Sequence, residues 1–391
     1  MFKGNIHIIS ILMVFMILNS MPIDIYLPAV DSIAIDLNSN TGTVQNGIFI
    51  YMISMGVGQL LLGPASDKYG RKPIAVLSLI VYFIASVLAT FISSIEGLMF
   101  SRLLQGIGAC GCAITAMAVV RDIFNENESA RVYSILNSVQ SLVPALAPIA
   151  GGVIANTYGW RYCFVLLTVM SLITFFIAGN YLKETNGNRD PVIKDASYFS
   201  IVTNSQFIGY CLAGMAAMAF IVQYVVISPL LLMDNLGMTS TEFSLIFGAN
   251  ALIIIFASYL ATKLIKSTSP TVAVIIGLIL LLVSSVLFFI QPNPESITEY
   301  LVIVTIGSFG FSFCLGSAIG MSLSPFGQNA GKASSILGFF QFTITSLVGI
   351  GLGHFITNGA QSLAITVTLF SVTGFLVISM KICVNKLNFN N

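Results

Sequence analysis

Charged side chains are scarce in this sequence. Asp, Glu, Lys and Arg together make up 8% of the 391 residues, whereas soluble globular proteins carry about 25%. Hydrophobic residues make up 56%, and the mean hydropathy is +0.94. One soluble core cannot enclose this much apolar surface, so the composition indicates a membrane protein embedded in a lipid bilayer. The formal net charge of +1 gives no reason to expect a nucleic-acid partner.

The sequence also lacks the residue groups that mark disulfides, metal sites and catalysis. Its six cysteines lie in or beside apolar runs, without the loop spacing of a disulfide framework. Cys110 and Cys112 are two residues apart, so on a helix they point about 200° away from each other. No His-Glu-x-x-His helix and no aspartate-rich metal motif is present. We therefore expect no metal, no cofactor and no enzymatic activity. A ring of charges or a repeated filter sequence, which a channel requires, is missing as well.

Long apolar runs are what the sequence has in their place. Each run is roughly twenty residues long, enough to cross the bilayer as a helix. The first run is predicted to be a membrane helix rather than a signal peptide, because no small-residue cleavage site follows it. Twelve membrane helices are predicted, over residues 7–29, 44–64, 73–94, 97–119, 132–156, 161–182, 205–233, 241–263, 270–291, 299–323, 332–356 and 360–383.

The basic residues between these runs are distributed unevenly. On one side of the membrane the only basic residue is Arg161. Cytoplasmic segments carry the excess of Lys and Arg, so the other side and both termini are predicted to be cytoplasmic. That side holds Lys3, Lys68, Arg71, Lys72, Arg121, Arg131, Lys183, Arg189, Lys194, Lys263, Lys266, Lys332, Lys381 and Lys386.

The longest polar stretch follows the sixth run and divides the chain into halves. We predict an all-α membrane protein with a six-helix bundle at 1–183, a cytoplasmic linker at 184–204 and a second six-helix bundle at 205–391. Two such bundles are typical of alternating-access transporters, whose substrate site lies near the membrane midplane between the halves.

The segment from Gly63 to Pro73 carries the first sequence motif. It reads Gly-Pro-Ala-Ser-Asp-Lys-Tyr-Gly-Arg-Lys-Pro, in which Gly70 permits a tight turn and Pro73 suits the first position of the next helix. This segment resembles the G-x-x-x-D-[RK]-x-G-[RK]-[RK] signature of the major facilitator superfamily. The matching residues are Gly63, Asp67, Lys68, Gly70, Arg71 and Lys72. The resemblance implies a gating loop that locks the cytoplasmic side while the outside is open.

Two further motifs resemble those of proton-coupled members of the same superfamily. Arg102, Gln105, Gly106 and Gly108 match R-x-x-Q-G-x-G in the fourth span. Arg102 places a full charge inside an apolar run, and it either takes a functional role or extends its side chain to the outer interface. In the fifth span Pro148, Gly151 and Gly152 match the antiporter motif G-x-x-x-G-P-x-x-G-G. Val143 and Ala147 depart from it, which leaves proton-coupled import of a nutrient as an alternative to efflux.

Asp24 is the strongest single candidate for carrying protons. Of the fifteen acidic residues, it alone is predicted to lie well inside a membrane span. Burial in an apolar environment favours the neutral form of a carboxyl group, which suits proton transport. The alternative is a solvated residue at an early helix end before Pro28. The apolar run continues to Ile35, however, so a longer helix would bring Asp24 deeper and within reach of Arg102.

The Asp-x-Tyr-Leu-Pro-Ala string that begins at Asp24 resembles drug:proton antiporters of the Bcr/CflA type. The likeness extends through Arg121–Phe124, Tyr158–Tyr162 and Ala330–Ser335 and covers nearly the whole chain. The family resemblance implies proton-driven efflux of drugs, or of an endogenous metabolite or siderophore, across the bacterial cytoplasmic membrane. Protons and one small molecule are the expected partners of a monomer.

Polar residues inside the apolar spans are candidates for substrate contacts. A lone amide more often bonds a neighbouring helix, and this alternative stays open for each of them. Trp160 and Tyr162, at the outer end of the sixth span, are expected to anchor it at the membrane interface. The substrate candidates are Tyr26, Gln105, Asn137, Gln140, Gln223, Tyr224, Asn250 and Gln341.

Overall fold

A computed structural model describes residues 6–185, 197–356 and 358–389, and every regular element in these ranges is helical. Lys3, Arg189, Lys194 and most of the predicted linker lie outside the described residues. Twelve helices are long and apolar enough to cross a membrane, so the predicted number of spans is confirmed. The segments predicted from hydropathy coincide with them to within a few residues at nearly every end.

The chain forms two compact units, Met1–Pro191 with Met238–Ala251 and Val192–Gly237 with Leu252–Asn391. The helix α10 contributes its first part to one unit and its second part to the other. The division of the chain into bundles at residues 183 and 205 stays a prediction.

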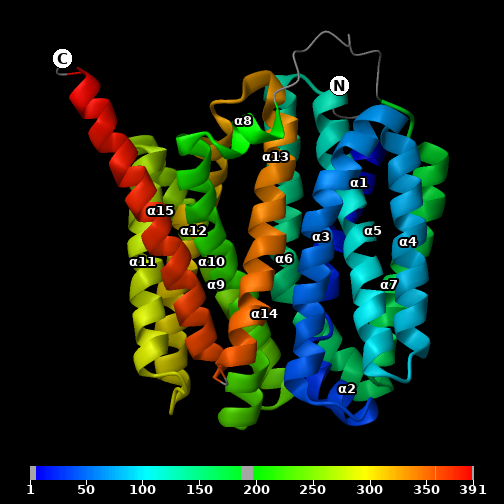
Figure 1. Cartoon of the computed structure of the whole chain (residues 1–391). Helices are drawn as coiled ribbons and strands as arrows, with labels where there is room; N and C mark the ends of the chain where they lie inside the picture. Colours follow the sequence, from blue (N-terminus) through cyan, green and yellow to red (C-terminus); the bar gives the residue numbers. More distant parts are fainter. Residues whose placement is uncertain (1–5, 186–196, 357, 390–391) are drawn as a thin grey trace. The chain divides into compact units, whose positions relative to one another are not determined.

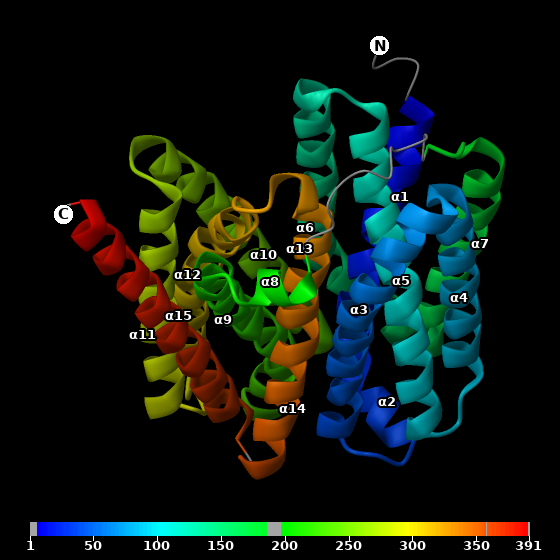
Figure 2. The same ribbon diagram turned by 45° about the horizontal axis from the view of Figure 1, so that its top comes forward.

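The first unit is built from long helices that run side by side, as α3, α4, α5 and α7 do in Figures 1 and 2. The last residue before α4 is Gly70, which alone separates it from α3, so the predicted gating loop is helical at every other position. Pro73 consequently occupies the third position of α4 rather than the first. The elements are α1 Ile6–Asp24, the 3₁₀ turn η2 Leu27–Ala29, α2 Val30–Asp36, α3 Thr41–Tyr69, α4 Arg71–Phe91, α5 Ile95–Ile123, α6 Glu126–Tyr158 and α7 Arg161–Tyr181.

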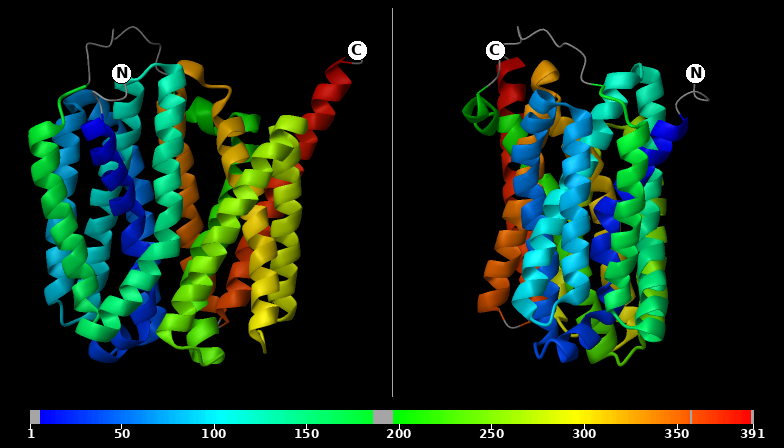
Figure 3. Two further views of the ribbon diagram at one scale, coloured as in Figure 1. Left: turned by 180° about the vertical axis from the view of Figure 1, so that it is seen from behind. Right: turned by 90° about the vertical axis from the view of Figure 1, so that its right-hand side faces the viewer.

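In the second unit α9, α11, α12 and α15 pack against one another, and α11 and α12 lie side by side in Figure 3. Two of its spans contain π-helical turns, η3 at the end of the seventh span and η5 in the middle of the eleventh. The elements are α8 Tyr198–Val202, α9 Ser205–Pro229, η3 Leu230–Asn235, α10 Ser240–Ser267, α11 Pro270–Ile290, α12 Ile297–Leu323, η4 Gly327–Asn329, α13 Ala330–Gly338, η5 Phe339–Ile344, α14 Thr345–Phe355 and α15 Gly359–Phe389.

Glycines allow the close helix contacts that hold the first unit together. A Cβ atom at Gly108 of α5 would lie 2.7 Å from the carbonyl oxygen of Ser78 and 2.7 Å from the backbone nitrogen of Tyr82, both on α4. Small residues at such contacts bring membrane helices together in the absence of a hydrophobic driving force.

Gly108→Ala is therefore expected to destabilise the protein by about 2 kcal/mol, because the backbone of α4 must move away. Gly179→Ala is the matched control, since a Cβ atom at that helical position meets nothing within 4 Å. This control is expected to be neutral or stabilising by about 0.5 to 1 kcal/mol, as alanine has the higher helix propensity. Thermal unfolding in detergent measures both, and equal midpoints would contradict the role assigned to the α4–α5 contact.

The predicted interfacial role of Trp160 is wrong. Trp160 is 5% exposed, packs edge-on against the ring of Phe164 at 5.9 Å, and its indole N–H donates to a carboxylate oxygen of Asp36 at 3.3 Å. Arg161 forms an ion pair with the same carboxylate. Sequence position could not show this, because Asp36 lies more than a hundred residues away. Tyr162, by contrast, is 51% exposed.

Candidate functional site

Asp24 lies at an interruption of the first membrane span. It is the last residue of α1, its side chain is 4% exposed, and the span continues through η2 and α2 to Asp36. Pro28 has no N–H group, so the α-helical hydrogen bond to the carbonyl of Asp24 cannot form and the helix gives way to a 3₁₀ turn. The longer first span is thus confirmed, and Asp24 lies inside it.

Arg102 of α5 is fully buried in the same unit, so its side chain does not extend to the interface. Its Nη1 donates to the side-chain oxygen of Gln105 at 2.8 Å, and the amide nitrogen of Gln105 donates to the hydroxyl of Ser86 at 2.9 Å. Residues three apart share one helix face, so Arg102 and Gln105 can bond to each other while Gln105 reaches α4.

Two tyrosine rings cover the guanidinium group of Arg102. Its central carbon lies 4.6 Å from the ring centre of Tyr26 and 4.9 Å from that of Tyr51. The hydroxyl of Tyr51 donates to the carbonyl oxygen of Asn19 at 2.6 Å, which fixes this ring against α1. Aromatic faces attract a cation, most strongly where water is excluded. Among the described residues the Nε and Nη2 atoms of Arg102 have no hydrogen-bond acceptor, so the aromatic faces are their main electrostatic partners there.

The expected direct pairing of Asp24 with Arg102 is not formed. The ion pairs among the residues that the structure describes involve Arg71, Arg121 and Arg161, and none of them joins Asp24 to Arg102. The unit therefore holds a buried acid and a separate buried base, with Tyr26 two residues after the acid and in contact with the base.

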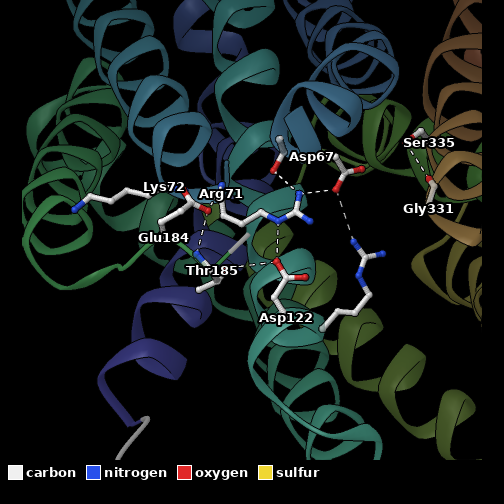
Figure 4. A network of polar contacts seen from close by, with 10 residues as sticks. Asp67, Arg71, Lys72, Asp122, Glu184, Thr185, Gly331 and Ser335 are labelled. Atoms are coloured by element: carbon white, nitrogen blue, oxygen red, sulfur yellow. Dashed lines mark hydrogen bonds and ion pairs between the residues drawn. The ribbon is translucent and has the colours of Figure 1, made fainter. Parts of the chain in front are cut away.

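The predicted gating loop, residues 63–73, centres on the guanidinium group of Arg71 (Figure 4). Its Nη1 lies 2.7 Å from the carboxylate of Asp67 and 3.1 Å from the hydroxyl of Ser66, and its Nε lies 2.8 Å from the carboxylate of Asp122. The side chain of Arg71 is 1% exposed and that of Asp122 is 5% exposed, whereas Asp67 is 56% exposed. Arg71 is thus held between one buried and one solvated carboxylate.

The other motif residues frame this network. Gly63 lies in the last turns of α3, and the amine of Lys72 donates to the carbonyl oxygen of Gly179 on α7 at 2.8 Å. Sequence reasoning did not assign a role to Asp122 or to Glu184, although both contact Arg71. Asp122 follows a basic residue at the end of the fourth span, which is only a weak sequence signal for a role in this network. No sequence pattern singles out Glu184.

The glycines of the fifth-span motif bring α6 against the first span. A Cβ atom at Gly151 would overlap the carbonyl oxygen of Ile25, so only glycine fits beside the residue that follows Asp24. On the same helix, the carbonyl oxygen of Pro148 accepts a hydrogen bond from the hydroxyl of Ser244 at 3.0 Å, and a Cβ atom at Gly152 would lie 3.1 Å from that hydroxyl. The close approach of helices that the motif predicts is present.

The substrate candidates are divided between the two units, and Tyr26 and Gln105 both contact Arg102 in the first. Asn137 is exposed, Gln140 is half-buried and Asn250 is buried in the first unit. Gln223, Tyr224 and Gln341 are buried in the second unit. Gln341 lies on η5, where a Cβ atom at Gly214 would come within 2.3 Å of its amide nitrogen.

Comparison with known proteins identifies relatives in sequence and in fold. The chain is similar to the multidrug resistance protein MdtL of Salmonella paratyphi C, with 32% identity over 338 residues, 83% of this chain and 82% of the relative. MdtL of Klebsiella pneumoniae is 29% identical over 331 residues, which are 83% of each chain. In fold it resembles a bacterial homologue of the human lysosomal transporter Spinster, solved in an inward-facing and occupied conformation. Their TM-score is 0.75 at 16% identity, covering 95% of this chain and 96% of that one.

The sequence profile described as Major Facilitator Superfamily matches residues 12–351. The match spans the first eleven membrane helices and includes all three motifs of the first unit. This chain is a multi-pass membrane protein that belongs to the Major Facilitator Superfamily.

Proposed function

We propose that this protein is a proton-coupled antiporter that exports small organic molecules across the bacterial cytoplasmic membrane. The observation that carries the proposal is a buried carboxyl group, Asp24, at an interruption of a membrane span. An acidic side chain is costly at such a position, so its presence there favours a functional role. It can accept and release a proton when the site opens to each side in turn.

The buried base lies one contact away from this acid. Tyr26 is in the turn that follows Asp24, and its ring covers the guanidinium group of Arg102. A shift of the turn when Asp24 gains or loses its proton would therefore also move a ring that stabilises Arg102. We propose that Asp24 carries the proton and that Arg102, held by Gln105, biases its release without a direct ion pair.

Proton influx supplies enough free energy for this task. Each charge that crosses 100 mV releases about 2.3 kcal/mol, and a gradient of one pH unit adds about 1.4 kcal/mol. One proton per substrate is sufficient for concentration ratios of several hundredfold.

The names of the MdtL relatives support a drug as substrate, and an endogenous metabolite or siderophore is the alternative. We assign the chain to the Bcr/CflA type of the drug:proton antiporters on its Asp-x-Tyr-Leu-Pro-Ala string. The contacts of Gly151 and Gly152 support export, because the close helix packing of the antiporter motif persists despite Val143 and Ala147. Both termini are proposed to be cytoplasmic and the working unit to be a monomer.

Everted membrane vesicles with an acid interior test this function. Adding a panel of amphiphilic drugs and siderophores is expected to release protons only from vesicles that contain the protein, with uptake of the active compound. Vesicles from cells that carry the empty vector are the control. Compound movement without any proton flux would contradict antiport and indicate an uncoupled facilitator. Flux of the compound and protons together in the same direction would favour proton-coupled import.

A further inference from the structure

The helix α4 begins without a capping side chain of its own. Three other long helices of the first unit, α3, α5 and α6, are capped locally: Asn40, Ser94 and Asn125 each accept a hydrogen bond from a backbone N–H three residues later. The corresponding residue of α4 is Gly70, which has no side chain. The first N–H groups of α4 therefore need an acceptor from elsewhere.

Glu184 supplies that acceptor from a distant part of the chain. Its two carboxylate oxygens accept the backbone N–H groups of Arg71 at 2.9 Å and of Lys72 at 3.1 Å. Glu184 lies just after α7 and is separated from Arg71 by 113 residues. A carboxylate at a helix N-terminus also interacts favourably with the helix dipole.

The geometry of Gly70 is matched to this cap. Its φ of +101° is a conformation that residues with a side chain rarely adopt. A Cβ atom there would also come within 2.4 Å of a carboxylate oxygen of Glu184. Glycine at this motif position thus leaves room for the turn and for the carboxylate that closes it.

The cap acts on the residues that form the gating network. Because Glu184 holds the backbone of Arg71, it fixes the point from which the guanidinium group reaches Asp67 and Asp122. The next residue, Thr185, donates from its hydroxyl to the carboxylate of Asp122 at 3.3 Å (Figure 4). Two consecutive residues after α7 therefore hold both the base and the buried acid of the network.

We infer that Glu184 is a positioning residue of the gating loop and ties the chain segment after the sixth span to the gate. The inference rests on the proposed function for its effect on transport, but its structural part stands on the contacts alone. A displacement of this segment would withdraw the carboxylate from α4 and release Arg71 from its fixed position.

Spin labels test the structural part first. Labels on cysteines introduced at the exposed positions Lys68 and Lys183 report the separation of the gating loop from the end of α7. In purified protein Glu184→Ala is expected to broaden the spin–spin distance distribution, while Glu184→Asp keeps part of the order. Glu128→Ala, which removes a carboxylate from the first turn of α6, is the matched control. An unchanged distribution in Glu184→Ala would overturn the inference.

Transport assays test the functional part. Loss of two charge-assisted hydrogen bonds at a partly solvated site is expected to lower the maximal transport rate about three- to tenfold. The substrate KM should stay within about twofold, because Glu184 positions the gate and not the substrate. A raised KM at an unchanged maximal rate would overturn the positioning role. If wild-type vesicles release no protons on substrate addition, the proposed function fails while the spin-label result still decides the role of Glu184.

Discussion

Asp24→Asn is expected to abolish substrate-evoked proton release and to lower uphill transport to the level of vesicles without the protein. Asparagine keeps the size and hydrogen-bonding capacity of the buried side chain but cannot exchange a proton. Asp24 is 4% exposed and has no ion-pair partner among the described residues, so its replacement leaves no buried charge behind. The variant should therefore fold normally and fail only in coupling.

Fluorescence of a pH-sensitive dye in everted vesicles measures this effect. Asp234→Asn is the matched control, because Asp234 is exposed at the end of the seventh span and its variant should release protons at the wild-type rate. Equal amounts of the variants in the membrane are verified by immunoblotting. A fully active Asp24→Asn variant would contradict the proposal that Asp24 carries the proton. A variant that still binds substrate but releases no protons would support the proposal.

Asp122→Asn is expected to destabilise the protein by about 2 to 4 kcal/mol, and Asp67→Asn by less than about 1 kcal/mol. Both carboxylates contact Arg71 at nearly the same distance, 2.8 Å for Asp122 and 2.7 Å for Asp67. They differ in burial, since Asp122 is 5% exposed and Asp67 is 56% exposed. Breaking the buried pair leaves the 1% exposed guanidinium with less compensation, whereas water replaces much of what Asp67 provides.

Thermal unfolding in detergent ranks the two variants, and transport is measured beside it. A gating role predicts that Asp67→Asn lowers the transport rate although its unfolding midpoint stays near that of the wild type. Equal destabilisation by the two substitutions would show that burial does not determine the strength of these pairs. A wild-type transport rate in Asp67→Asn would remove Asp67 from the gate.

The sequence was sufficient to predict the spans but not their interruptions. Each span is a continuous apolar run, and crossing a bilayer requires a helix of fixed length, so hydropathy located all twelve. Hydropathy gives no sign of the π-helical turns η3 and η5. The sequence is equally apolar whether the backbone hydrogen bonds join residues four or five apart. The apolar run to Ile35 indicated a longer first span, yet only the structure shows that a 3₁₀ turn at Leu27–Ala29 interrupts it.

The candidate site could be predicted where its residues are neighbours in sequence. Arg102 and Gln105 share a helix face, and Asp67 and Arg71 lie one turn apart, so spacing alone placed each pair together. The faces of Tyr26 and Tyr51 over Arg102, and the carboxylate of Glu184 at the start of α4, join residues from different spans. These contacts depend on how helices are rotated about their axes, which hydropathy does not determine.

Because the first span is interrupted, Asp24 lies at the end of an α-helix and not in the middle of one. A continuous α-helix transmits rotation along its axis, but a 3₁₀ turn next to a proline bends at lower cost. Gain or loss of charge at Asp24 would therefore act on a hinge. The protonation site of this span thus coincides with its most easily bent point, and not with the middle of a continuous helix.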